Sequence, residues 1–173
     1  MDAKLWALLL LLVLISVSGS AQEKSKKQIK EEQKKEKQKQ TDSLLFAKDF
    51  VFVPGTALPQ GGKTMNIAAS SYSVIFKPEH IKSYMPFYGR AYSGVGYGSD
   101  EGMMFEGKPE EFTVSLGKKN YLVKAVVKGK SDTYILSLTV SFTGSASLTV
   151  TSNNRSSISY NGEIRAYDKE FKK

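Results

Sequence analysis

The stretch Tyr134-Ile-Leu-Ser-Leu-Thr-Val-Ser-Phe142 decides the fold, because apolar and small polar residues alternate along most of its length. Its apolar side carries Tyr134, Leu136, Leu138, Val140 and Phe142. A period of two is typical of a β-strand with one buried face. The segment therefore predicts an antiparallel sheet that covers a core with one face and meets water with the other.

The same alternation continues on both sides of this stretch. Strands are predicted within 72–76, 112–116, 121–127 and 146–150, with shorter candidates at 50–53, 65–69 and 103–105. Short segments rich in Gly, Asn, Asp and Ser separate several of these runs, at 117–120, 129–132 and 143–145. Such spacing is typical of hairpins, so a meander is the simplest topology.

Two local details are also predicted. Asn161-Gly162 is a hairpin signal, and a three-residue loop over 161–163 with a glycine bulge would pair Tyr160 with Ile164 and Ile158 with Ala166. The segment 78–83 is expected to form one helical turn. Together the patterns predict a mainly β protein. About eight strands form an antiparallel meander, as a sandwich or a strongly curved sheet, after one polar N-terminal helix.

The first 21 residues have the composition of a secretion signal peptide. Lys4 precedes an apolar run of 11 residues, and small residues follow up to Ala21. A bilayer-spanning helix needs roughly 20 apolar residues, so no transmembrane span is expected after cleavage. The chain has no cysteine, which excludes a lipid anchor of the bacterial lipoprotein kind.

Residues 22–40 form a Lys/Glu/Gln segment with a charge of +4 and a single large apolar residue, Ile29. Strong helix formers and opposite charges four residues apart predict a solvated helical spacer. Residues 41–173 are then one domain, whose size suits a single core without disulfides. Its own excess charge of +4 is ordinary for a soluble surface and predicts no nucleic-acid partner.

No pattern of residues predicts catalysis or a cofactor. His80 is the only histidine, and zinc sites need several ligands at defined spacing, so no metal is expected. Asp100 and Glu101 are neighbours, and neighbouring side chains on an extended strand point to opposite faces. The glycines at 94, 96 and 98 lack the spacing and the following helix of a phosphate-binding loop. The prediction is a protein without enzymatic activity, with a hydrolase that uses Asp100, Glu101 or His80 as the alternative.

The aromatic stretch Tyr84-Met-Pro-Phe-Tyr-Gly-Arg-Ala-Tyr92 is the strongest candidate for a binding site. Tyrosine offers an apolar ring with a polar tip, and arginine offers a planar fork of donors. Core packing is the competing interpretation, because aromatic residues also fill β cores. The residues expected to bind a ligand are Tyr88, Arg90, Tyr92 and Tyr97.

Several stretches together resemble an uncharacterised exported family of Bacteroidetes, a domain of unknown function. They are the block 84–92, then Gly102-Met-Met-Phe-Glu-Gly107, the stretch 141–150 and Arg155-Ser-Ser-Ile-Ser-Tyr-Asn-Gly162. The resemblance covers roughly residues 42–167 and implies a Gram-negative cell envelope. It implies no activity, cofactor or catalytic residue.

These observations predict an exported cell-envelope protein, secreted into the periplasm or beyond it, that acts as a binding or interaction module. Its partner would be an envelope glycan, peptide or protein. A structural role in an envelope assembly is a further alternative, which would require a large exposed apolar patch.

Overall fold

The computed structural model describes residues 26–68, 71–92, 102–130 and 132–167. Over these residues the chain forms one helix followed by ten strands of a single antiparallel sheet. The predicted signal peptide, Tyr97, Asp100, Glu101 and the three glycines at 94, 96 and 98 lie outside the described residues. No helix within the described ranges is both long enough and apolar enough to span a membrane.

The strands fall into two groups along the chain. The first group contains β1 (Phe50–Pro59), β2 (Met65–Asn66), β3 (Ser73–Lys77), β4 (His80–Met85) and β5 (Met103–Gly107). The second contains β6 (Pro109–Leu116), β7 (Asn120–Lys128), β8 (Thr133–Ser141), β9 (Ser145–Ser152) and β10 (Ile158–Arg165). Hairpin turns close at the predicted places, where Gly117 N donates to Asn120 O and Gly129 N donates to Asp132 O, both at 2.8 Å.

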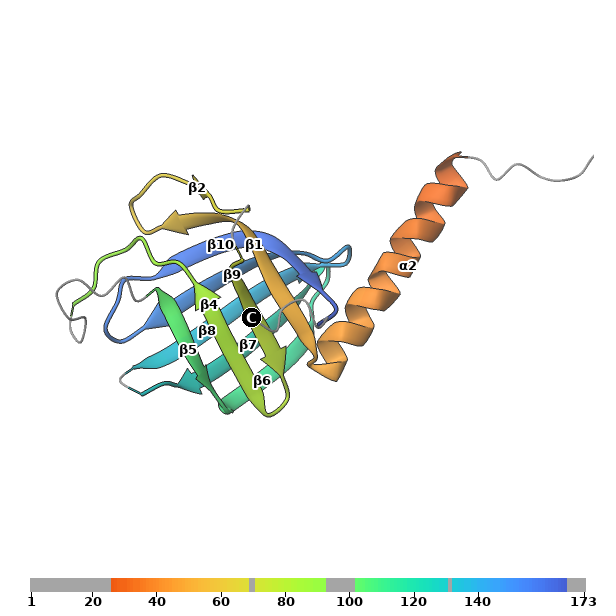
Figure 1. Cartoon of the computed structure of the whole chain (residues 1–173). Coiled ribbons are helices and arrows are strands. Elements are labelled where there is room, and N and C mark those ends of the chain that lie inside the picture. The colour runs from red at the N-terminus through yellow and green to blue at the C-terminus, as the bar shows by residue number, and fades with distance from the viewer. Residues whose placement is uncertain (1–25, 69–70, 93–101, 131, 168–173) are drawn as a thin grey trace, which may run out of the picture. The chain divides into compact units, whose positions relative to one another are not determined.

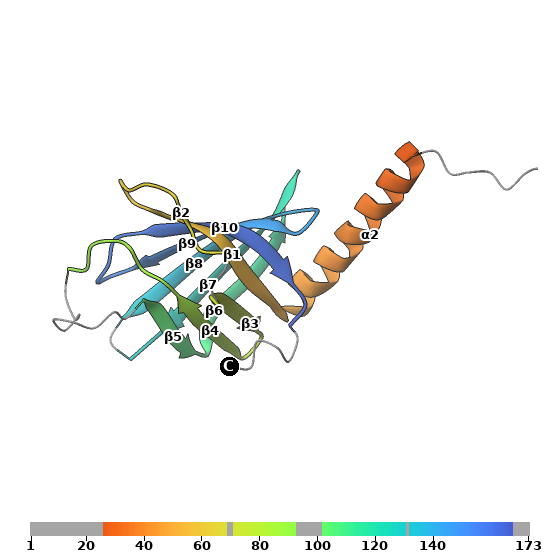
Figure 2. The same ribbon diagram turned by 45° about the horizontal axis from the view of Figure 1, so that its top comes forward.

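The sheet is a meander that curls into a nearly closed barrel. Its strand order is β5-β4-β3-β1-β10-β9-β8-β7-β6, and β2 adds to β1. The two edge strands, β5 and β6, follow each other along the chain and are separated only by Lys108. Figures 1 and 2 show β3–β5 curling across the β6–β9 part of the sheet. The strongly curved sheet is thus confirmed, and two separate stacked sheets do not form.

The core lies inside this curl and contains the apolar residues that the alternation predicts. Buried residues in β8 are Tyr134, Leu136, Leu138 and Val140. Aromatic rings join the two sides of the curl: Phe105 of β5 stacks on Tyr134 at 4.0 Å, and Phe76 of β3 contacts Phe112 of β6 at 5.9 Å between ring centroids. Burial of these faces is the main force that holds the sheet in its curved form.

The prediction of a hairpin at Asn161-Gly162 is wrong, because β10 runs through both residues without a turn. Ile158, Tyr160 and Ile164 then all lie on one face by simple alternation, and all three are buried. Tyr160 pairs with Leu148 rather than with Ile164. The glycine is needed for close approach to β1: a Cβ at Gly162 would lie 2.1 Å from the carbonyl oxygen of Val53. The bulge belongs to β1, between Pro54 and Thr56.

The prediction of a helical turn at 78–83 is also wrong. Only 78–79 form a turn, and His80 begins β4, which pairs with β3 in a tight hairpin. Ile81 and Met85 face the core from this strand. The buried positions Ile81, Ser83 and Met85 follow the period of two that is typical of a strand. The strand predicted at 65–69 is confirmed only as the two-residue β2.

Helix α2 spans Lys26–Ala47, and its residues from Lys34 onward belong to the same compact unit as the sheet. Within this unit, its last turns pack on the sheet: Leu45 is completely buried and Leu44 packs against the core. The helix ends in a Schellman-like arrangement, with Lys48 in the left-handed region at φ 53°. The Lys48 ammonium group hydrogen-bonds to the Phe112 carbonyl oxygen and lies 4.8 Å from the Phe112 ring centroid.

Candidate functional site

The predicted aromatic segment leaves β4 and pairs with the corner between β9 and β10. Ser156 N donates to the Arg90 carbonyl oxygen at 2.9 Å, and Tyr92 N donates to the Asn154 carbonyl oxygen at 2.8 Å. The Ser156 hydroxyl also accepts from Arg90 N at 3.0 Å. An isolated antiparallel bridge pairs Ala91 with Arg155. These bonds hold the backbone of 90–92 against the body of the sheet.

Two glycines allow this close packing. A Cβ at Gly89 would lie 2.3 Å from the Ser156 hydroxyl oxygen, so any larger residue would push the segment away from the corner. A Cβ at Gly102 would lie 2.1 Å from the carbonyl oxygen of Met85, where the chain returns to begin β5. Gly89 and Gly102 therefore allow the chain to pack closely where a side chain would not fit.

Arg155 lies beneath the segment and links it to the start of β5. Its side chain is buried, and Nη1 donates to the Gly102 carbonyl oxygen at 2.9 Å. The guanidinium carbon lies 5.3 Å from the centroid of the Phe87 ring, a cation–π arrangement. Arg155 is a supporting residue that was not predicted individually, although it belongs to one of the stretches that carry the resemblance to a domain of unknown function.

Tyr160 supports the same segment from β10. Its buried hydroxyl donates to the Pro86 carbonyl oxygen at 2.6 Å. Burial raises the pKa of Tyr160 well above its ordinary value of 10.0, the nearby Tyr88 raises it further, and the positive charge of Arg155 lowers it in part. Tyr160 therefore keeps its proton and its hydrogen bond at any physiological pH.

The predicted binding residues stand on the solvent side of this support. Tyr88, Arg90 and Tyr92 are all exposed, and 68% of the Tyr92 surface is accessible. Phe87 and Gly89, which alternate with Tyr88 and Arg90, are only partly exposed. The structure thus leaves three of the four predicted residues exposed, and Tyr97 lies outside the described residues.

Two further tyrosines and a methionine extend this surface. The rings of Tyr72 and Tyr84 are in contact at 5.6 Å, and Tyr84 faces Met104 across the β4–β5 pair. Partial burial raises the pKa of Tyr88, and the phenol group of Tyr72 raises it further. We call Tyr72, Tyr84, Tyr88, Arg90, Tyr92 and Met104 the aromatic surface. The alternation of β4 would have identified Tyr84 as outward-facing if 78–83 had been recognised as a strand.

The residues of the hydrolase alternative do not form a site in the described part of the chain. His80 is exposed at the β3–β4 turn, opposite Lys77. Asp100 and Glu101 lie outside the described residues. Within the described ranges no group of three or more His, Cys, Asp or Glu residues could hold a metal ion.

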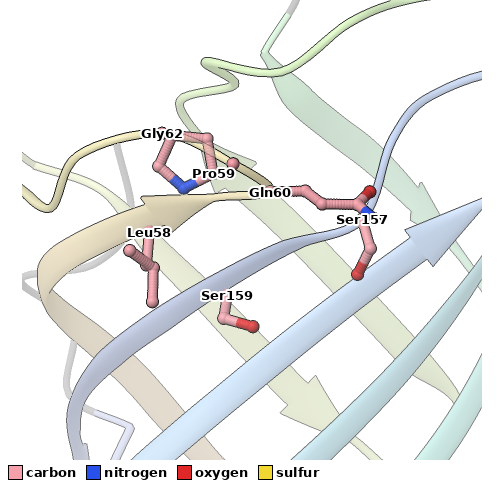
Figure 3. A pocket seen from close by; sticks show the side chains of 7 residues that line it. Leu58, Pro59, Gln60, Gly62, Ser157 and Ser159 are labelled. Atoms are coloured by element: carbon pink, nitrogen blue, oxygen red, sulfur yellow. The ribbon is translucent and has the colours of Figure 1, made fainter.

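A hollow of about 360 Å³ lies close to the β9–β10 corner, on the outer surface of the sheet. Leu58 and Pro59 line it from the end of β1, Gln60 from the turn that follows, and Ser157 and Ser159 from the start of β10 (Figure 3). Its walls carry no charged side chain. Ser157 follows directly after Arg155 and Ser156, so one short segment serves both the aromatic surface and this hollow.

Comparison with known proteins gives a family and a fold. The family model described as a domain of unknown function, DUF4251, matches residues 32–164. A crystal structure of a DUF4251 family protein from Bacteroides eggerthii DSM 20697 is similar, with a TM-score of 0.59 and 17% identity. The match covers 75% of this chain and 87% of that one. No curated protein matches the chain.

Proposed function

The chain belongs to the DUF4251 family, and on that premise we propose that it is a non-enzymatic binding module of the cell envelope. The proposal rests on one observation. Tyr88, Arg90 and Tyr92 stand exposed on a segment whose backbone is hydrogen-bonded to the buried residues Ser156 and Tyr160. A fixed backbone reduces the entropy lost when exposed side chains bind a partner.

The composition of the aromatic surface suits recognition. Tyrosine and arginine are the side chains that most often dominate binding energy at protein interfaces, together with tryptophan. Tyrosine also buries a large area while losing only two side-chain rotations. Exposed apolar area that gathers in one place, as Tyr84 and Met104 do here, is a general mark of an interaction site.

The envelope setting rests on the sequence of the first 21 residues. A basic residue, an apolar run too short to span a bilayer and a small-residue end support export across the inner membrane. The similar structure from a Bacteroides species is consistent with a Gram-negative host. The proposed destination is the periplasm, and the proposed partners are an envelope glycan, peptide or protein.

The test compares binding by the wild-type protein and an Arg90→Ala/Tyr92→Ala variant. Envelope glycans, peptides and lipids are titrated against each protein, with Lys118→Ala, in the exposed β6–β7 turn, as a control outside the aromatic surface. Loss of two interface anchors should weaken binding at least about tenfold. The control should bind like the wild type. Equal affinity of the double variant and the wild type for every ligand bound would disprove the proposed site.

A single-cysteine reporter sharpens this experiment. Because the chain contains no cysteine, a cysteine placed at Ala91 would be the only thiol for a fluorescent label. Ala91 is exposed and lies between Arg90 and Tyr92. A label there should change its fluorescence when the same ligands bind. A label at Ser43, on the exposed side of α2, should not respond.

A further inference from the structure

The outer face of β8, β9 and β10 differs in chemistry from the rest of the surface. Its central positions carry only hydroxyl and amide side chains. We call this set the hydroxyl face: Ser137, Thr139, Ser147, Thr149, Ser159 and Asn161. In a chain with 24% charged residues, six adjacent positions without a charge form a distinct area.

Strand register arranges these residues in two parallel rows. In the first row Ser159 lies opposite Thr149, and Thr149 lies opposite Ser137. In the second row Asn161 lies opposite Ser147, which lies opposite Thr139. Neighbouring strands are about 4.8 Å apart, so each row presents a polar group at a regular short interval. The hydroxyl oxygens of Thr149 and Ser159 lie 2.9 Å apart and are hydrogen-bonded.

The ion pairs of the described residues lie outside this area. Lys82 pairs with Glu106 across β4–β5, and Lys124 pairs with Glu111 across β6–β7. Arg165 pairs with Glu163 at the far end of β10. In β7, Lys124 lies opposite Ser137 and Leu122 lies opposite Thr139, while in β1 Leu58 lies opposite Ser159. The hydroxyl face itself contains no charge.

The hollow described above opens at one end of the first row. Ser159 belongs to both, and Leu58, which lies opposite Ser159 in β1, forms part of the wall. Figure 3 shows Gln60 and Ser157 beside Ser159, with Leu58 and Pro59 from the end of β1. Its volume of about 360 Å³ is at the lower end of the range found for small-molecule sites.

We propose that the hollow and the hydroxyl face together bind a neutral glycan chain. One sugar unit occupies the hollow, with its apolar C–H groups on Leu58 and Pro59 and its hydroxyl groups on Gln60, Ser157 and Ser159. The following units lie across the first row, over Thr149 and Ser137. This surface is separate from the aromatic surface that carries the proposed function.

The hydrogen-bonding groups of the hollow and of the hydroxyl face favour a neutral sugar as the ligand. Serine, threonine and glutamine side chains each donate and accept hydrogen bonds, as do the hydroxyl groups of a sugar. A ligand with carboxylate or phosphate groups would find no cation in the hollow to replace its water. An apolar peptide would find little apolar area beyond Leu58 and Pro59. A hydroxyl-rich, uncharged chain satisfies all of these groups at once.

The experiment is a titration of the full chain, isotope-labelled for amide NMR, with oligosaccharides of matched length. The neutral probes are hexamers of glucose, mannose, galactose and N-acetylglucosamine, and the charged probe is a hexamer of galacturonic acid. At least one neutral hexamer should shift the amide signals of Leu58, 60–62, 147–149 and 157–161. The galacturonic acid hexamer should bind at least about tenfold more weakly to this surface, because the hollow offers no cation to replace the water that a carboxylate loses on contact.

Three variants connect the binding to the named groups. Thr149→Val/Ser159→Ala removes two hydroxyl groups while keeping side chains of similar shape, and should weaken binding about tenfold. Gln60→Ala changes an exposed turn residue that cannot affect the core, and should weaken it severalfold. Thr113→Val, on the exposed side of β6, should leave the affinity unchanged.

Four outcomes would overturn the proposal. The first is the absence of shifts at these amides with every neutral hexamer at millimolar concentration. The second is equal binding of neutral and uronic acid hexamers, and the third is wild-type affinity in both the double variant and Gln60→Ala. The fourth is concentration-dependent dimerisation that Thr149→Arg abolishes, which would identify a second copy of this chain as the occupant. Each of these outcomes leaves the Arg90 and Tyr92 experiment unaffected, so the two proposals fail separately.

Discussion

The curled sheet is covered at two places by non-sheet segments of very different character. The last turns of α2 cover one place with apolar packing: Leu45 is completely buried, and the Phe46 ring meets Tyr121 edge-on at 6.3 Å. The segment 86–92 covers the other, near the β9–β10 corner, where the hydroxyl groups of Ser156 and Tyr160 hold its backbone through hydrogen bonds. Its outward side chains, Tyr88 and Tyr92, remain exposed.

This difference separates stability from recognition. Apolar burial at the helix contributes stability in proportion to the area removed from water. At the segment 86–92 the supporting groups are buried while Arg90 and Tyr92 contact mainly solvent. Variants of the two regions should therefore differ in the size of their effects on folding, and the expected effects below run from the largest to the smallest.

Leu45→Ala should produce the largest loss. The substitution leaves a cavity in the core beneath α2, and the free energy of unfolding should fall by about 2–5 kcal/mol. Urea unfolding followed by circular dichroism measures this change. Ser43→Ala, on the exposed side of the same helical turn, should change it by less than about 0.5 kcal/mol. Equal effects of the two variants would show that α2 does not stabilise the sheet by packing.

Tyr160→Phe should produce an intermediate loss at the other region. It removes the hydrogen bond to the Pro86 carbonyl oxygen and leaves that buried acceptor without its partner, at a cost of about 1–3 kcal/mol. Tyr88→Phe removes a hydroxyl from an exposed ring and serves as the matched control. If both variants unfold like the wild type, the Tyr160 hydroxyl does not hold the segment in place.

The dependence of stability on alkaline pH isolates the same tyrosine. The unfolded chain releases the Tyr160 proton near its ordinary pKa of 10.0, whereas the folded chain keeps it to higher pH. Its contribution is therefore complete below pH 10 and is lost as the pH rises above that value. The wild type should lose stability above pH 10 more steeply than Tyr160→Phe. Parallel curves for the two proteins would contradict the buried, protonated state of Tyr160.

The strands of this protein could be predicted largely from the sequence, because their alternation reports burial on one face. β8 matches its prediction nearly residue by residue, because Leu136, Leu138 and Val140 are apolar and can leave water only on the core face of the sheet. Asn161-Gly162 misled the prediction of β10. The pair is a common turn signal, and the reason for the glycine is contact with Val53 in a strand about a hundred residues away.

The candidate site could be predicted only in part, for a related reason. Tyr88, Arg90 and Tyr92 belong to one short block whose aromatic content is visible in the sequence. The residues that support them, Arg155 and Tyr160, come from a distant corner and are recognisable only once the pairing of Ala91 with Arg155 is known. The hydroxyl face likewise depends on strand register, which small polar residues do not specify by themselves.

A shortened chain that begins at Lys34 should show a small effect. Residues 26–33 are exposed along the helix, and the contacts of Thr41 and Leu45 with the core lie beyond them. The free energy of unfolding should therefore stay within about 0.5 kcal/mol of that of the full chain. Thermal unfolding of the two proteins, side by side, measures this. A clearly lower melting temperature would show that the first turns of α2 contribute to folding.

The most direct test of the separation between stability and recognition is urea unfolding of the Arg90→Ala/Tyr92→Ala variant. Because both side chains face solvent, the free energy of unfolding should differ from that of the wild type by less than about 0.5 kcal/mol. The same variant should fail to bind the partner of the wild-type protein. A loss of more than about 1.5 kcal/mol would mean that these residues hold the fold together, and the aromatic surface would then be part of the structure rather than a surface for binding.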